Sequence, residues 1–159
     1  MIDFSSVGII QQMLAPGIMI SACGLLILGI NNKYSIVVGR IRALEEEKRR
    51  LVSFLRKNNI EEEQKVRLNS IVMQVDKFSF RVKLIRNAVF FYSIAVAFFI
   101  LASLSIGLQF MTQATQLEIV SLTLFLLGML SVFLGILQVA REIWKGHEIV
   151  KIEIRESEF

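Results

Sequence analysis

The sequence has little of what disulfide-rich domains, metal centres and enzymes depend on. It has one cysteine, one histidine and one proline in 159 residues. A single cysteine cannot form a disulfide within the chain, and one cysteine with one histidine cannot build a Cys/His metal site. No nucleophile with a matching base and no glycine-rich phosphate loop is visible. We therefore expect no catalytic residue, no metal, no cofactor and no enzymatic activity.

Charge is also missing from long parts of the chain. Residues 4–32, 87–117 and 119–140 contain no Asp, Glu, Lys, Arg or His. Each stretch is long enough for a helix to cross a hydrocarbon layer about 30 Å thick, and a chain of this size cannot surround three helices that are apolar on every face. The sequence therefore predicts an all-α membrane protein. The three transmembrane helices are expected near residues 9–31, 88–110 and 119–140.

The basic residues predict how the chain is oriented in the membrane. Residues 31–87 contain 14 Lys and Arg against 7 Asp and Glu, residues 111–118 contain no Lys or Arg, and residues 141–159 contain four. We expect the protein in the inner (plasma) membrane. Because Lys and Arg are retained on the cytoplasmic side, we expect its N-terminus outside and its C-terminus in the cytoplasm. The expected parts are a first transmembrane segment (1–32), a cytoplasmic segment (33–87), a second and third transmembrane helix (88–140) and a cytoplasmic tail (141–159).

Apolar residues in the cytoplasmic segment recur in alternating steps of four and three, with Lys48 as the one charged residue in the series. This spacing predicts an antiparallel coiled-coil hairpin between the first and second transmembrane helices, closed within one chain or between chains. The two series are Val37, Ile41, Leu44, Lys48, Leu51 and Leu55, then Leu68, Ile71, Val75, Phe78, Val82, Ile85 and Val89. The turn contains Asn59, a good N-cap for the second helix. The tail alternates apolar and charged residues from Val150 to Arg155, which is compatible with a short strand or an interfacial segment.

The first span has a weakly polar character that suggests contacts beyond anchoring. Gly17, Ser21 and Gly24 share one helix face, and Gly128, Ser131 and Gly135 form a similar stripe on the third span; small residues let helices approach closely in lipid. The second span is bulkier, and we expect it in an outer layer or facing lipid. The candidate pore-lining or helix-packing residues are Gln11, Gln12, Gly17, Ser21, Gly24, Asn31 and Asn32.

The basic residues next to the membrane point to lipid as a partner. The sequence has a pI of about 9.5, but acidic residues are mixed with the basic ones in the cytoplasmic segment, so we do not expect nucleic-acid binding. Cations at this depth instead suit anionic lipid headgroups. The candidate headgroup contacts are Lys33, Arg40, Arg42, Lys83 and Arg86.

One stretch resembles a known family. The sequence LAPGIMISACGLLILGINNKYSIVVGRIRAL (residues 14–44) is similar to the signature region of a bacterial small membrane-protein family of unknown function, of the DUF 2721 type, in which a proline, an Ile-Ser-Ala core and an Asn-Arg pair precede an Arg-Ile-Arg segment. Here Pro16, residues 20–22 and residues 40–42 match, and Asn32-Lys33 replaces the Asn-Arg pair while keeping its charge. The resemblance covers most of the chain and implies a fold but no activity. In topology alone the chain is similar to the Oxa-type insertases.

These features lead to one functional expectation and two alternatives. We expect a homo-oligomeric membrane protein whose first transmembrane helix lines a passive ion channel or pore, because no intramembrane charge is available for ion-coupled transport and identical subunits surround a pore by cyclic symmetry. One alternative is an insertase or membrane chaperone of the Oxa type. The other is a non-conducting scaffold whose hairpin docks a soluble partner.

Overall fold

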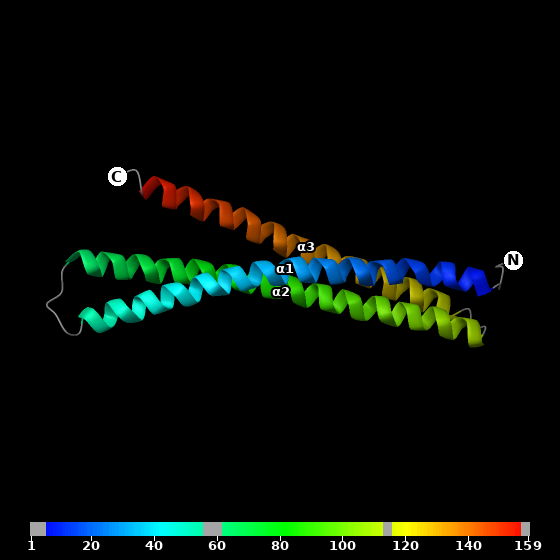
Figure 1. The fold of residues 1–159 in the computed structure, drawn as a ribbon. Coiled ribbons are helices and arrows are strands. Elements are labelled where there is room, and N and C mark those ends of the chain that lie inside the picture. The colour runs from blue at the N-terminus through cyan, green and yellow to red at the C-terminus, as the bar shows by residue number, and fades with distance from the viewer. Residues whose placement is uncertain (1–5, 56–61, 113–115, 157–159) are drawn as a thin grey trace. The chain divides into compact units, whose positions relative to one another are not determined.

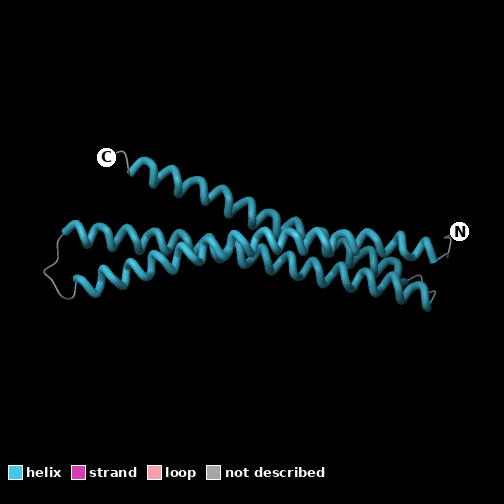
Figure 2. The backbone as a smooth tube through the Cα atoms, in the orientation of Figure 1, coloured by secondary structure: helices cyan, strands magenta, loops and turns pink. Residues whose placement is uncertain are grey.

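The computed structural model describes residues 6–55, 62–112 and 116–156, with side chains described from residue 8 to 144 apart from those of 9, 55–63 and 113–115. Three long α-helices account for all of these residues: α1 (Ser6–Leu55), α2 (Glu62–Thr112) and α3 (Gln116–Glu156) (Figures 1 and 2). The stretches Ile10–Phe54, Gln64–Thr112 and Gln116–Trp144 each contain a window long and apolar enough to cross a membrane. The prediction of an all-α chain with three apolar, membrane-spanning helices is confirmed.

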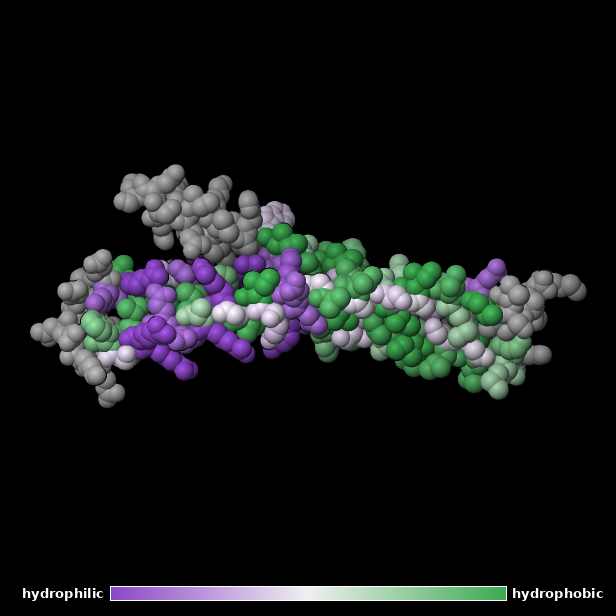
Figure 3. Space-filling model, viewed as in Figure 1, coloured by the Kyte–Doolittle hydropathy of each residue, from purple (hydrophilic) through white to green (hydrophobic). Residues whose placement is uncertain are grey.

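The chain divides into two compact units. The apolar unit consists of residues 1–30 and 87–140, and the charged unit of residues 31–86 and 141–159. Figure 3 shows the corresponding surfaces: hydrophobic residues gather over the first unit and hydrophilic residues over the second. The boundaries fall inside all three helices, so no loop separates the units. The sequence allows this because it has no proline or glycine cluster near residues 30, 86 or 140 to end a helix.

In the apolar unit, α2 supplies most of the core. Five of its residues are essentially inaccessible and follow steps of four and three: Ala88, Tyr92, Ala95, Phe99 and Ala102. From α1, Pro16, Cys23 and Ile30 are buried at seven-residue intervals. The second span was expected in an outer layer or facing lipid. An outer layer is wrong for the buried face of α2, whereas the opposite face, with Phe90, Ile100 and Leu104, is exposed, and its contact with lipid stays a prediction. Alanines alternate with large aromatic residues on one face of α2, so this bulky helix still presents a surface that its neighbours can pack against closely.

In the charged unit, α1 and α2 run antiparallel and side by side (Figure 1). The residues most deeply buried there are Val37 and Leu44 of α1 with Ile71 and Ile85 of α2. Across the pair, Arg67 donates two hydrogen bonds to Glu47 Oε1, of 3.1 and 2.9 Å. The apolar series noted in the sequence therefore includes the buried face of each helix. The predicted turn, with Asn59, lies outside the described residues.

The tail is the part of the chain where the structure adds most to the sequence. α3 continues without a break to Glu156, so the residues from 141 onward extend the third helix. A short strand, one of the two alternatives for this segment, is thereby excluded. The alternation of apolar and charged residues from Val150 to Arg155 lies within this helix.

Candidate functional site

Gly17, Ser21 and Gly24, which we call the open stripe, lie on an uncovered face of α1. All three are exposed, and a Cβ atom built on either glycine would meet no atom within 4 Å beyond the adjacent residues and the local backbone of α1 itself. The Ser21 hydroxyl donates a hydrogen bond of 3.3 Å to the Gly17 carbonyl oxygen of the same helix. The Ser21 hydroxyl therefore already has a hydrogen-bond partner within its own helix, and the side chains of the open stripe are small.

A shallow groove runs along the N-terminal half of this face. Its volume is about 400 Å³ and it opens broadly to the surroundings. Its lining is apolar except for the serine hydroxyl, and consists of Ile10, Met13, Leu14, Gly17, Ile18 and Ser21. A groove of this kind can accept the ridge of a second apolar helix, because small residues at its floor let the two backbones approach closely.

The matching residues of α3, Gly128, Ser131 and Gly135, form a covered stripe. A Cβ atom at Gly128 would lie 2.7 Å from Cε1 of Phe99, and one at Gly135 would lie 2.7 Å from Cε1 of Tyr92. Between them, the Ser131 hydroxyl donates a hydrogen bond of 2.7 Å to the Phe91 carbonyl oxygen of α2. Two aromatic rings of α2 therefore occupy the space that the missing side chains leave, and the serine links the two helices.

All seven residues predicted to line a pore or to pack helices are exposed on α1. At about 100° per residue, Asn31 and Asn32 fall on the same side of α1 as the open stripe, so five of the seven share an arc of about 100°. Gln11 and Gln12 lie outside that arc, on its two flanks. The helix thus groups the small residues with the two asparagines and leaves the two glutamines apart.

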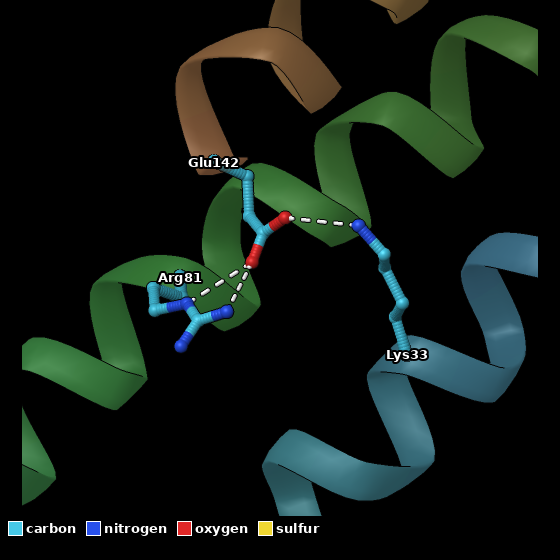
Figure 4. Close-up of polar contacts among 3 residues, drawn as sticks. All are labelled: Lys33, Arg81 and Glu142. Carbon is cyan, nitrogen blue, oxygen red and sulfur yellow. Dashed lines mark hydrogen bonds and ion pairs between the residues drawn. The ribbon is translucent and has the colours of Figure 1, made fainter. Parts of the chain in front are cut away.

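Within the charged unit, one glutamate joins all three helices. Glu142 of α3 is 2% exposed, and its Oε1 accepts hydrogen bonds of 3.0 and 2.6 Å from Nε and Nη2 of Arg81 on α2 (Figure 4). Its other oxygen, Oε2, lies 3.7 Å from Nζ of Lys33 on α1. We call these three residues the ion cluster. A carboxylate this deeply buried is stable only with its charge compensated, which ties the three helices together at this point.

The sequence predicted a function for only one member of the ion cluster. Lys33 was assigned to lipid headgroups, and its side chain is half-exposed while it pairs with Glu142. Arg81 and Glu142 were missed. A signal for Glu142 was present: it follows Gly135 by seven residues, as Gly135 follows Gly128, so it continues the face of α3 that packs inward. The other predicted headgroup residues, Arg40, Arg42, Lys83 and Arg86, are all exposed.

Neither the two stripes nor the ion cluster offers a metal site within the part of the chain that the structure describes. There, no group of three or more His, Cys, Asp and Glu side chains is close enough to hold a metal ion. The carboxylate of Glu142 is already engaged by two cations.

Comparison with known proteins places the chain in a family. Residues 13–152 match the family described as "Protein of unknown function (DUF2721)", and the chain belongs to it. No curated protein and no solved structure matches the chain. The matched range includes the open stripe, the covered stripe and the ion cluster, so all three are features of the family's region of the chain.

Proposed function

For this member of the DUF2721 family we propose the role of a subunit in a homo-oligomeric membrane pore, assembled through the open stripe of α1. The observation that carries the proposal is the contrast between two similar stripes in one unit. Aromatic rings of α2 cover Gly128 and Gly135, whereas nothing lies within 4 Å of the Cβ positions of Gly17 and Gly24. Small-residue faces in lipid gain their stabilisation from close helix contact, so an open one is suited to another helix.

The proposed partner for the open stripe is a second copy of the same chain, because no other protein is then required. Helices do not associate in lipid because of the hydrophobic effect, since lipid tails are as apolar as leucine; they associate where surfaces fit. Around a rotational symmetry axis, the same face of every subunit can contact its neighbour. The groove along Ile10, Leu14 and Ile18 extends the contact beyond the three small residues.

The asparagines give the proposed pore its chemistry. In a ring of subunits, Asn31 and Asn32 continue the face of the open stripe and present neutral amides. Amides can replace water around a permeating ion without binding it tightly. In α1, no acidic or basic side chain lies between residues 10 and 32. The proposed permeation is therefore passive and uncoupled from proton transfer.

The finer topology belongs to the same proposal. The antiparallel α1–α2 pair of the charged unit is proposed to be a cytoplasmic coiled-coil hairpin that positions the subunits, with the N-terminus outside. The packing of α1 on α2 is supported by the burial of Val37, Leu44, Ile71 and Ile85. The cytoplasmic location of the pair is supported by the excess of Lys and Arg in residues 31–87. Its exposed cations, which include Arg40 and Arg86, are proposed to contact anionic lipid.

The first experiment measures oligomeric state in lipid nanodiscs for the wild type, Gly24→Leu and Gly29→Leu. Gly29 is the matched control, because it is also exposed with nothing within 4 Å of its Cβ position but lies about 120° around α1 from Gly17. We expect a defined oligomer for the wild type and Gly29→Leu, and its loss for Gly24→Leu. A monomeric wild type, or equal behaviour of the two variants, would contradict assembly through this face.

The second experiment tests conduction in planar bilayers with Asn31→Asp and Asn87→Asp. Both asparagines are exposed, but only Asn31 lies on α1 next to the open stripe. A ring of carboxylates in a pore favours cations, so we expect Asn31→Asp to raise the cation-to-anion permeability ratio and Asn87→Asp to leave it unchanged. Absence of current across ions and voltages for an oligomeric wild type would refute the pore while leaving the assembly intact.

A second candidate function uses the same groove differently. In an Oxa-type insertase or chaperone, the groove formed by Ile10, Leu14 and Ser21 would receive a helix of a client protein. A monomeric subunit would favour this alternative. A photo-crosslinker at Ser21 would then capture nascent membrane chains, and one at Gly29 would not. Capture of only a second copy of this chain would favour the oligomer.

A further inference from the structure

Positive charge in the charged unit is gathered in the stretches that adjoin the apolar unit along the chain. Residues 45–76 carry seven Lys and Arg and seven Asp and Glu, so their charges balance. Residues 33–44, 77–86 and 141–144, which we call the basic end, carry eight Lys and Arg against one acidic residue, Glu142, a net charge of +7. Cations gathered next to apolar helices are typical of a surface that meets anionic lipid headgroups.

The ion cluster in the basic end contains two cations and one carboxylate, so it has one positive charge in excess. Arg81 engages the carboxylate closely, with hydrogen bonds of 3.0 and 2.6 Å to Oε1 of Glu142. Lys33, on the other side of Glu142 in Figure 4, has its Nζ 3.7 Å from Oε2, which is longer than a hydrogen bond. The side chain of Lys33 is 49% exposed and that of Arg81 23%. An ammonium has three N–H donors, so an acceptor from outside the protein can reach Lys33.

Two exposed aromatic residues accompany the cluster in the sequence. Tyr34 follows Lys33 directly on α1, and Trp144 follows Glu142 by two residues on α3. Their exposed fractions are 41% and 82%. Trp and Tyr are enriched at the level of lipid headgroups, because each combines an apolar ring with a polar N–H or O–H. The two rings therefore point to headgroups beside the cluster, independently of its charge.

We propose that Lys33 binds the phosphate group of an anionic membrane lipid, and that the phosphate replaces Glu142 as its partner. Arg81 keeps the carboxylate neutralised, because two charge-assisted hydrogen bonds hold Glu142 to it. Phosphate and carboxylate repel each other, so they do not share one ammonium. Lipid binding therefore releases α1 from α3 at this contact and leaves the α2–α3 contact intact. The proposal rests on the lipid contact proposed above for the cations of the charged unit, and not on the pore.

The test uses the full-length protein in micelles of a neutral detergent, with Trp144 as a fluorescent probe because it is the single tryptophan of the chain. Phosphatidylglycerol with brominated acyl chains is added in steps, and the bromine atoms quench the fluorescence when the lipid lies beside α3. The variants are Lys33→Gln, Lys33→Arg and Lys83→Gln. Lys83 is the matched control, because it is an exposed lysine of the basic end that lies about 200° around α2 from Arg81.

We expect half-maximal quenching of Lys33→Gln to need several-fold more lipid than that of the wild type, and Lys33→Arg and Lys83→Gln to stay close to the wild type. Equal weakening by Lys33→Gln and Lys83→Gln would overturn the site and leave only a general attraction of charge. Equal quenching of the wild type by brominated phosphatidylcholine would overturn the site together with the lipid contact of the cations. Relief of quenching by inorganic phosphate, beyond that by potassium chloride at equal ionic strength, would overturn lipid as the source of the phosphate.

Glu142→Gln tests the exchange of partners. Without the competing carboxylate, Lys33 is available to the phosphate, so we expect half-maximal quenching at several-fold less lipid than for the wild type. Asp76→Asn removes one exposed carboxylate elsewhere on α2 and controls for the change in net charge. Circular dichroism checks that both variants are helical, and the Lys33 variants test the site if Glu142→Gln does not fold. No gain for Glu142→Gln, or an equal gain for Asp76→Asn, would overturn the exchange.

Discussion

The two small-residue stripes of the apolar unit are nearly alike in composition and differ in what surrounds them. Each has two glycines and a serine within eight residues of one helix. On α3 the glycines receive the rings of Phe99 and Tyr92, and Ser131 bonds to another helix; on α1 the glycines face open space, and Ser21 bonds within its own helix. A stripe of this kind therefore allows another helix to pack closely but does not ensure that one does. The aromatic residues of the neighbouring helix decide whether it is used within the chain.

The largest effect should come from filling the covered stripe. Gly128→Leu places a side chain where even a Cβ atom would be 2.7 Å from the buried ring of Phe99, so α2 and α3 must separate or Phe99 must leave its position. We expect a loss of about 3 kcal/mol in the free energy of unfolding, the upper part of the usual range for overpacking. SDS titration in detergent micelles, followed by circular dichroism, measures it.

Gly24→Leu is the matched control for this prediction and sharpens the comparison. The same added side chain meets no neighbour on α1. We therefore expect the free energy of unfolding of the single chain to stay within about 0.5 kcal/mol of the wild-type value, as for surface substitutions. Equal destabilisation by the two variants would mean that both stripes are packed in the folded subunit. The distinction drawn between them would then fail.

The next effect concerns the charged unit, which is held together by ion pairing as well as apolar contact. Glu142→Gln removes the buried carboxylate and leaves the partly exposed Arg81 and Lys33 without their counter-charge. Breaking a buried ion pair typically costs about 3 to 5 kcal/mol, and because both cations are partly exposed we expect about 2 kcal/mol here. The same SDS titration reports it, and hydrogen exchange should localise the loss to residues around 81 and 142.

A charge swap separates the specific contact from a general loss of charge. Arg81→Glu combined with Glu142→Arg restores one pair with the reverse polarity, so the double variant should recover part of the stability that each single variant loses. Additive losses in the double variant would show that Arg81 and Glu142 do not interact. In that case α3 is held in the charged unit by other contacts.

The sequence predicted the three helices because hydropathy and the absence of charge are properties of each segment alone. It also identified both small-residue stripes by spacing. It could not tell which stripe is covered, since that depends on Tyr92 and Phe99 being seven residues apart on a helix that was expected to lie outside the core. Pairing between segments far apart in the chain leaves no mark in the composition of either one.

Glu142 was missed for the same reason. As a charged residue just beyond the third span, it looked like the start of a solvated tail, although it is 2% exposed. Its burial depends on Arg81, which lies 61 residues earlier in the chain. The tail was open between a strand and an interfacial segment because its alternation of residue types suits both, and only the continuity of α3 decides that it is helical.

The smallest effect should come from the two serines. Ser131→Ala removes a hydrogen bond of 2.7 Å between α3 and the Phe91 carbonyl, and interhelical bonds of this kind in membranes average about 0.6 kcal/mol. Ser21→Ala removes a bond of 3.3 Å to a carbonyl that already belongs to the same helix, so we expect no measurable change in subunit stability. In the oligomer assay, however, Ser21→Ala keeps the face small and should preserve assembly. If Ser21→Ala instead dissociated the oligomer as Gly24→Leu does, the serine would bond across subunits, and close packing alone would not explain how the open stripe is used.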